Sequence, residues 1–249
     1  MSDMQPERVV ILGVPINNLT IDDALEQIAA FLQQGQPHQV VTVNPEFVME
    51  AQHNPEFQHV LLQADLATPD GFGVLLAARW QGTPLRGRVT GVELTRRIAE
   101  LAAQKGYRLF LLGATPGVAQ QAAAVLIAQS PGLTIAGCFA GSPAPRHEPF
   151  LRQIIAAARP DVLLVAYGHP AQDLWIARNQ PFLRIPVAIG VGGVFDYLAG
   201  RIPLAPTWIR RLGLEWLYRL CHQPRRWRRI LVAVPYFTWA VLRAHRVRQ

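Results

Sequence analysis

Short apolar runs alternate along the chain with longer segments in which apolar residues recur at helical spacing. Segment 20–34 shows the helical pattern clearly, because Leu25, Ile28 and Leu32 fall on one stripe and Thr20 can cap the first turn. Comparable patterns cover residues 92–104, 117–129, 148–158 and 171–180. The apolar runs read as buried strands, at residues 9–14, 39–43, 107–113, 133–137, 161–167 and 186–191.

This alternation of strands and helices predicts an α/β fold. We expect a parallel, Rossmann-like sheet with helices on both faces, arranged in one or two lobes. Sheets of this type bind ligands beyond the carboxyl ends of their strands. Residues that carry chemistry are therefore expected in the loops that follow the strands.

Charge divides the chain near residue 200. Residues 201–249 contain 11 of the 24 Lys and Arg residues and a single acidic residue, Glu215. Residues 1–200 carry a slight excess of acid, so the formal charge of +7 comes from the C-terminal segment. We expect an α/β core at 1–200 and a basic helical appendage at 201–249.

The appendage combines arginine with an apolar, aromatic run. Four arginines at 225–229 precede the run 230–242, which contains Tyr236 and Trp239 and is interrupted by Pro235. Arginine beside tryptophan and tyrosine is typical of a segment at an anionic membrane surface. A run of 13 residues is too short to span a bilayer, which takes roughly 20. We expect this segment to lie on the membrane, with the four arginines contacting lipid headgroups.

Cysteine, histidine and the N-terminal residues narrow the function further. The polar N-terminus lacks the pattern of a signal peptide, so we expect the body of the protein in the cytosol. Cys138 and Cys221 lie far apart, and the seven histidines include no H-x-H or H-x-x-x-H pair. We therefore expect reduced thiols and no metal site.

Polar residues follow two of the apolar runs. Thr42 and Asn44 end the run 39–43 and could hydrogen-bond a ligand, although Asn-Pro also begins helices. Asp70 lies in a Pro-Asp-Gly turn and is either a general base at the sheet edge or a helix cap. Taken alone, the pattern favours the structural interpretation at both places.

Glycine-rich turns follow two further strands. The turns 113–117 and 190–196 could let a phosphate or nucleotide approach backbone amides, although glycine also allows close packing of a helix on a strand. Neither turn matches G-x-G-x-x-G or a P-loop. Gln172 and Asp173 open a helix after Gly-His-Pro and could bind the hydroxyl groups of a sugar, or serve as an ordinary first turn.

These loops, in this order, resemble those of the WecG/TagA/CpsF family of bacterial glycosyltransferases, over about residues 9–229. The motifs are Thr42-x-Asn44, Asp70-Gly71, Arg88-Val-Thr-Gly91, Gly113–Gly117, Gly168-His-Pro-Ala-Gln172-Asp173, Gly190–Asp196 and Gly213-Leu-Glu-Trp-Leu-Tyr-Arg-Leu220. No single motif is decisive, but seven in order are hard to obtain by chance. The sequence departs from the family pattern at Ala171, Asp173 and Leu204, where the family has lysine, glutamate and arginine.

The resemblance implies an inverting glycosyltransferase that needs neither metal nor cofactor. It would move N-acetylmannosamine, or in an exopolysaccharide pathway another sugar such as glucuronate, from a UDP-sugar to a polyprenyl-diphosphate-linked saccharide. It also implies a role in cell-surface polysaccharide biosynthesis, peripheral on the inner face of the plasma membrane.

The resemblance assigns individual residues as well. Asp70 matches the proposed base of the family, and Arg219 lies inside its most specific motif and is expected to contact a diphosphate. The residues expected to bind the UDP-sugar are Gly113, Gln172, Asp173, Gly192 and Asp196. Those expected nearer the sugar and acceptor are Thr42, Asn44 and Arg88.

The residues also allow two other classes of function. An arginine-rich segment with several tryptophans could bind nucleic acid without catalysis. The scarcity of lysine and the apolar run 230–242 favour lipid over nucleic acid. A nucleotide-dependent oxidoreductase would be expected to carry G-x-G-x-x-G, which this sequence lacks.

Overall fold

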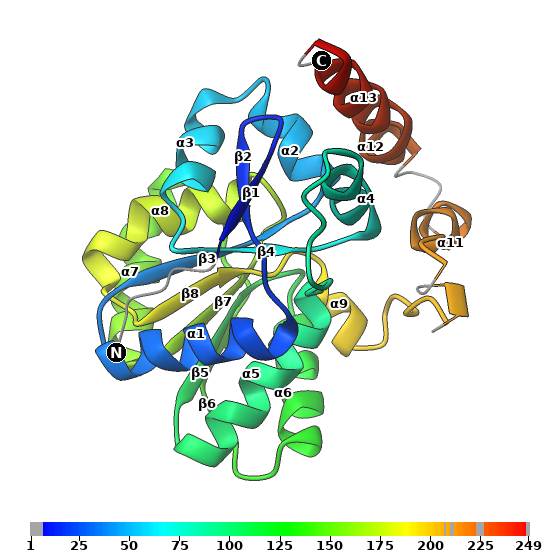
Figure 1. The fold of residues 1–249 in the computed structure, drawn as a ribbon. Coiled ribbons are helices and arrows are strands. Elements are labelled where there is room, and N and C mark those ends of the chain that lie inside the picture. The colour runs from blue at the N-terminus through cyan, green and yellow to red at the C-terminus, as the bar shows by residue number, and fades with distance from the viewer. Residues whose placement is uncertain (1–6, 207, 210–211, 223–226, 248–249) are drawn as a thin grey trace.

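The computed structural model describes residues 7–206, 208–209, 212–222 and 227–247 (Figure 1). Its strands are β1 (Arg8–Ile11), β2 (Val14–Asn17), β3 (His38–Val43), β4 (Leu66–Pro69), β5 (Arg108–Gly113), β6 (Thr134–Phe139), β7 (Val162–Ala166) and β8 (Val187–Gly190). The helices of the first two hundred residues are α1 (Ile21–Gln34), α2 (Pro45–Ala51), α3 (Pro55–Gln63), α4 (Phe72–Trp80), α5 (Gly91–Lys105), α6 (Val118–Gln129), the short η1 (Pro145–His147), α7 (Glu148–Ala158), α8 (Ala171–Leu183) and α9 (Val194–Leu198). Those of the C-terminal segment are α11 (Glu215–His222), α12 (Trp227–Leu231), η3 (Val232–Tyr236) and α13 (Phe237–Val247).

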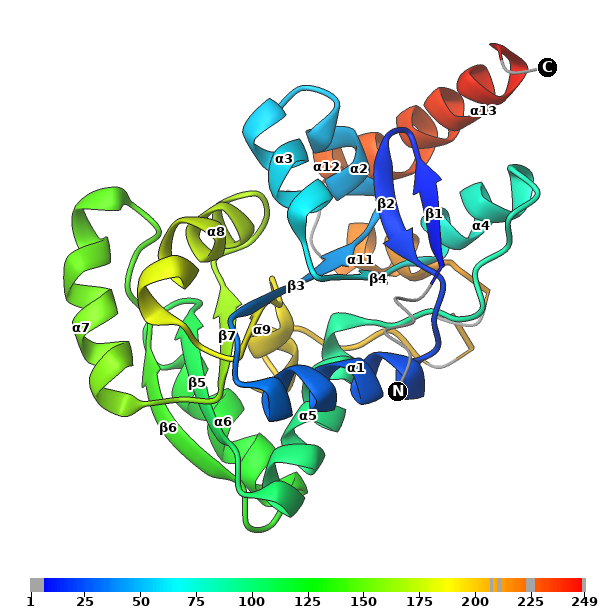
Figure 2. The same cartoon turned by 60° about the vertical axis from the view of Figure 1, so that its left-hand side comes forward.

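Six strands form one parallel sheet in the order β4-β3-β8-β7-β5-β6 (labelled in Figure 1 and turned in Figure 2). Each hydrogen-bonded pair in it is parallel, so the carboxyl ends of all six strands meet at one edge. The chain starts the sheet with β3 and ends it with β8, and these two strands lie side by side near its middle. The predicted α/β fold with a parallel sheet is confirmed.

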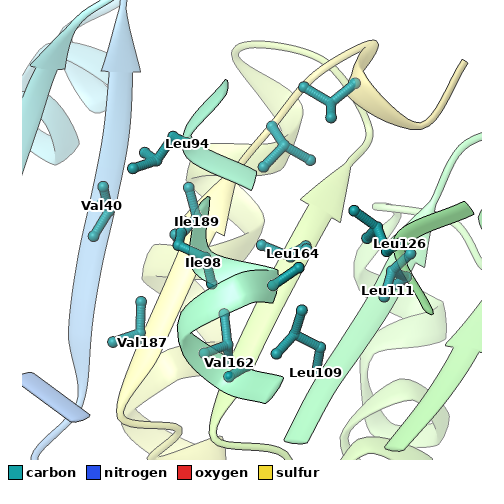
Figure 3. Close-up of a cluster of buried hydrophobic side chains, with 14 of the residues drawn as sticks. Val40, Leu94, Ile98, Leu109, Leu111, Leu126, Val162, Leu164, Val187 and Ile189 are labelled. Atoms are coloured by element: carbon teal, nitrogen blue, oxygen red, sulfur yellow. The ribbon is translucent and has the colours of Figure 1, made fainter. Parts of the chain in front are cut away.

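Both faces of the sheet are apolar, because successive side chains of a strand point to opposite sides. On one face, side chains such as Val40, Leu109, Leu164 and Ile189 meet α1, α5, α6 and α9. Figure 3 shows this face, with Leu94 and Ile98 of α5 over the strands. On the other face, α2, α3 and α4 cover the β3–β4 end of the sheet, and α7 and α8 cover the strands β5 and β7.

The prediction of a single strand over residues 9–14 is wrong. Leu12 and Gly13 adopt positive φ angles of 48° and 84°, and this tight turn divides the run into β1 and β2. The two strands pair antiparallel as a hairpin and do not join the main sheet. Successive positive φ angles are typical of the two-residue turns that connect hairpin strands.

Helix ends follow the capping chemistry of the sequence. Thr20 forms a capping box with Asp23, since its hydroxyl accepts from the Asp23 amide at 3.3 Å and its own amide donates to the Asp23 carboxylate at 2.7 Å. Asn44 and Asn54 cap α2 and α3 by accepting backbone hydrogen bonds at 3.1 Å. The helix-start interpretation of Asn44-Pro45 is thus confirmed. The interpretation of Asp70 as a helix cap is wrong, because the N-cap of α4 is Gly71. Helices α3 and α9 were not predicted.

The C-terminal segment packs against α2 and α4 (Figure 1). Phe237 and Val241 of α13 are almost fully buried in the same apolar cluster as residues of those two helices. Pro235 lies in η3, a π-helical turn between α12 and α13. Within the part of the chain that the structure describes, no helix is both long enough and apolar enough to cross a membrane.

Candidate active site

A cavity of about 480 Å³ lies at the carboxyl edge of the sheet. Loops that follow β3, β4, β7 and β8 form one wall, and residues of the C-terminal segment between 212 and 238 form another. The predicted site residues that line it are Thr42, Asn44, Asp70, Arg88, Gln172 and Gly192. These residues come from five separate places in the sequence, so the fold gathers a large part of the predicted site.

Asp70 follows β4 directly and lies where the sheet meets α5. Its backbone amide donates to the carbonyl of Val43 at 2.8 Å, which ties the turn to the end of β3. Its Oδ2 lies 4.0 Å from the position that a Cβ on Gly91 would take, so the carboxylate faces the first residue of α5. Gly71 turns the chain away with a φ of 101°, a conformation that favours glycine. The turn therefore holds the Asp70 carboxylate at the cavity.

Thr42 and Gln172 connect the strand ends beneath the cavity. The Thr42 hydroxyl donates to the carbonyl of Gly190 at 3.2 Å. The Gln172 side-chain oxygen accepts from the amide of Gly192 at 2.8 Å and from the amide of Gly168 at 3.1 Å. Gln172 thereby joins the loop after β7 to the loop after β8. Gly192 has a φ of 57°, and no atom lies within 4 Å of the position that its Cβ would take, so its backbone faces open space.

Arg88 connects the cavity to the C-terminal segment. Its guanidinium pairs with Glu215, the first residue of α11, at 3.4 Å, and both side chains are about four-fifths buried, with 20% and 21% exposed. Arg219 lies one turn further along α11, within the motif that predicted a diphosphate contact. The position of its side chain is outside the described part of the structure.

The chain resembles known proteins along nearly its whole length. The family model described as "Glycosyl transferase WecG/TagA/CpsF family" matches residues 9–249. The chain belongs to this family. It is therefore a glycosyltransferase, as the order of the motifs predicted.

Three bacterial relatives share the name N-acetylglucosaminyldiphosphoundecaprenol N-acetyl-beta-D-mannosaminyltransferase. The protein of Bacillus spizizenii strain W23 is 36% identical over 238 residues, which cover 93% of this chain and 91% of the relative. That of Bacillus subtilis strain 168 is 33% identical, with 96% and 92% covered. That of Staphylococcus aureus strain MW2 is 31% identical, with 96% and 94% covered.

In this glycosyltransferase, two predicted UDP-sugar ligands lie away from the cavity. Gly113 ends β5, and a Cβ there would lie 2.7 Å from the backbone carbon of Ala166, so this glycine permits close packing of β5 on β7. Asp196 lies in α9, where its backbone carbonyl accepts from the amides of Arg201 and Ile202. Neither residue lines the cavity. For Gly113 the strand order explains this, because β5 lies beyond β7, outside the four strands that surround the cavity. Asp196 follows β8, but on α9 it is Val194 and Tyr197 that line the cavity.

Asp173 lies below the cavity and is not part of its surface. Its side chain is fully buried, and burial raises the pKa of the carboxyl group to about 7. Its carboxylate, like the Gln172 amide, lies against Gly190, where any side chain would collide with both. This placement gives Gly190 a packing role and puts the Asp173 carboxyl group beneath the end of β8, whereas the hydrogen bonds to the neighbouring loops come from Gln172.

A polar cluster that the sequence patterns did not predict lies at the rim of the cavity. The Arg229 Nε donates to Glu46 at 2.8 Å, and an Arg229 Nη lies 3.2 Å from His169 Nδ1. The His169 Nε2 lies 3.4 Å from the same Glu46 carboxylate. The three residues come from α12, α2 and the loop after β7, and all three line the cavity. Arg229 was predicted to contact lipid headgroups, but the structure gives it a carboxylate partner at the site.

The described residues hold no cluster of three or more His, Cys, Asp or Glu side chains suited to a metal ion. Positive charge at the cavity comes from Arg88 and Arg229. The N-termini of α5 and α8 add to it, since Thr90 and Gly91 open α5 and Gly168 precedes α8 at the cavity surface.

Proposed function

We propose that this glycosyltransferase moves N-acetylmannosamine from a UDP-sugar to N-acetylglucosamine linked through a diphosphate to a polyprenol, with inversion at the anomeric carbon. The observation that carries the proposal is the position of Asp70, at the strand edge of a cavity whose rim carries two arginines. The names of the three relatives supply the sugar and the acceptor. In the proposed donor the sugar is α-linked to UDP, so the β linkage in the relatives' name requires inversion.

Inversion is a single displacement, so the acceptor hydroxyl attacks the anomeric carbon on the face opposite the departing UDP. A base must accept the proton of that hydroxyl as the new bond forms. Asp70 is assigned this role, because its turn holds the carboxylate at the cavity beside the start of α5. The carboxylates of Glu46 and Glu215 line the same cavity, but each holds an arginine in place.

Charge on the departing diphosphate must be stabilised, and positive groups fixed in the site do this without reorganisation. Arg88, Arg229 and the amides at the N-termini of α5 and α8 supply such groups. This arrangement supports a reaction that needs no metal. Thr42, Asn44, Gln172 and Gly192 provide hydroxyl, amide and backbone groups for the sugar and the nucleotide.

The C-terminal helices are proposed to hold the enzyme at the inner face of the plasma membrane, where its lipid acceptor resides. Trp227, Leu231, Tyr236 and Trp239 are 51%, 50%, 44% and 53% exposed, large fractions for such side chains. Arg228 lies over the Trp227 ring, with 5.3 Å between the guanidinium carbon and the ring centre. Exposed aromatic and cationic groups of this kind suit an anionic lipid surface. Together with the family membership they favour the enzyme over the nucleic-acid-binding alternative.

A donor panel tests the proposal. The purified protein is incubated with a synthetic prenyl-diphosphate N-acetylglucosamine and, separately, with labelled UDP-N-acetylmannosamine, UDP-N-acetylglucosamine and UDP-glucuronate. We expect transfer from UDP-N-acetylmannosamine alone, a β linkage by NMR, and a rate that a metal chelator does not lower. An α-linked product would reject inversion, and transfer of glucuronate alone would replace the proposed donor.

A further inference from the structure

The cavity has a second, apolar half that the reaction of the sugars does not use. Phe72, Leu76 and Trp80 of α4 line it, and they are spaced four residues apart, so they form one stripe along the helix. The opposite side of α4 is already buried in the core through Val74 and Ala77. Helix α4 therefore has two apolar faces, and one of them faces the cavity.

The C-terminal segment supplies the facing wall. Ile230, Ala233, Val234 and Phe237 line the same cavity at spacings of three and four residues, which again places them on one side of a helix. Phe237 closes the base of this wall, since its ring lies 3.7 Å from the position that a Cβ on Gly73 would take. The two apolar stripes thus meet at one end and leave space between them elsewhere.

Each wall begins beside a group of the polar half. Asp70 precedes Phe72 by two residues, and Arg229 comes directly before Ile230. The polar groups and the apolar stripes belong to one continuous cavity. A molecule that fills both halves must therefore join a polar head to an apolar chain. Phe72 is 44% exposed, and the other residues of the two stripes, except the buried Phe237, are only partly buried. A bound chain would remove more of this apolar surface from water.

We propose that α4 and the C-terminal helices form a groove that binds the first isoprene units of the acceptor's polyprenyl chain. This proposal rests on the proposed function, which requires a diphosphate joined to such a chain. The diphosphate would lie near Arg229, and the chain would run along α4 from Phe72 towards Trp80. At a helical rise of 1.5 Å per residue these two positions are about 12 Å apart, so the groove has room for only the first part of a long chain.

Acceptors of different chain length test the groove without a membrane. Synthetic N-acetylglucosamine diphosphates carrying one, two, three and five isoprene units are compared at concentrations where all stay monomeric. We expect kcat/KM to rise by roughly tenfold or more for each early isoprene unit and then to level off, since each fully buried methylene favours binding by about fourfold and an isoprene unit adds five carbons, part of which stays exposed in an open groove. The donor KM should stay the same throughout. Equal kcat/KM for the shortest and longest acceptors would overturn the proposal.

Two variants in the groove sharpen the test. Leu76→Trp is expected to fill the groove and to lower kcat/KM for the longer acceptors by roughly tenfold or more relative to kcat/KM for the one-isoprene acceptor. Trp80→Ala should flatten the dependence on chain length, and Trp80→Phe should restore it. Phe182→Ala is the matched control, because Phe182 is 67% exposed on α8 and does not line the cavity. If Leu76→Trp lowered activity on all acceptors equally, the chain would bind elsewhere.

These experiments distinguish a failure of the groove proposal from a failure of the proposed function. Transfer to the one-isoprene acceptor with no effect of chain length would support the function and reject the groove. If no acceptor reacts, displacement of a fluorescent prenyl phosphate from the unmodified protein still reports on the groove. The groove would be supported if geranylgeranyl phosphate displaced the fluorescent probe from the parent protein and displaced it less well from Leu76→Trp. Equal displacement by a phospholipid of similar carbon content would assign the groove to membrane lipid and overturn the proposal.

Discussion

Gly113 and Gly192 form a matched pair that tests where the nucleotide binds. Both are predicted UDP-sugar ligands in glycine-rich turns, but only Gly192 lines the cavity. A Cβ on Gly113 would lie 2.7 Å from the carbonyl carbon of Ala166, and its φ of 107° is one that L residues rarely adopt. A Cβ on Gly192 would meet no atom within 4 Å, and its φ of 57° lies in the left-handed helical region.

The two substitutions should therefore act on different quantities. For Gly113→Ala, backbone strain costs about 1–3 kcal/mol and overpacking costs about 1–3 kcal/mol. Together they should lower the free energy of unfolding by roughly 2–6 kcal/mol. That is a large part of the 5–15 kcal/mol typical of a folded domain. For Gly192→Ala, only the left-handed conformation contributes, and the expected loss is about 1–2 kcal/mol. Gly192→Val should, in addition, raise the donor KM, because its side chain projects into the cavity.

Urea denaturation gives the free energy of unfolding, and initial rates at a temperature where all variants are folded give the donor KM. Gly35→Ala is the control for strain alone, because Gly35 has a φ of 67°, no atom near its Cβ position, and a place at the end of α1. A folded Gly113→Ala that kept the stability of the parent but bound the donor weakly would refute the reasoning and place the nucleotide over β5.

Three further substitutions test other groups. Asp70→Asn should keep donor binding while lowering kcat by roughly 10²–10⁴, the usual contribution of a general base; a loss below threefold would remove Asp70 from that role. Because burial raises the Asp173 pKa to about 7, the folded state holds a proton that the unfolded state releases near pH 4. The free energy of unfolding should then fall as pH rises from about 4 to 7, and Asp173→Asn should remove this slope in urea titrations; a slope of opposite sign would contradict the assignment. Replacing Trp227 and Trp239 by serine should release the protein from anionic vesicles in sedimentation assays, with activity on a one-isoprene acceptor unchanged; vesicle binding equal to that of the parent would locate the membrane contact elsewhere.

The α/β fold could be predicted because local patterns specify it. Alternating apolar runs and helical stripes identify the strands and helices, and parallel strands bring the loops that follow them to one edge. Thr42, Asp70, Gln172 and Gly192 meet for this reason. The hairpin of β1 and β2 was missed because its signal is one turn of two residues, Leu12 and Gly13, inside an otherwise continuous apolar run.

The order of the strands could not be read from these patterns. A glycine turn after β5 looks the same in sequence as one after β8, but tertiary packing places β8 in the middle of the sheet and β5 beyond β7. Only the turn after β8 therefore reaches the cavity. Glu46, His169 and Arg229 were missed for a similar reason, because their interaction joins three segments whose separation in the sequence gives no sign of contact.

The C-terminal helices, which are proposed to bind the membrane, also form part of the cavity. Glu215 holds Arg88 at the site, Arg229 reaches Glu46 across the rim, and Phe237 packs against Gly73 and the apolar core. The outward side of the same helices presents Trp227 and Trp239. If these helices shift when they bind a lipid surface, one wall of the cavity shifts with them. The ion pairs Arg88–Glu215 and Arg229–Glu46 would be displaced as well. For this reason a complete truncation cannot separate membrane binding from catalysis, whereas substitutions confined to the exposed tryptophans can.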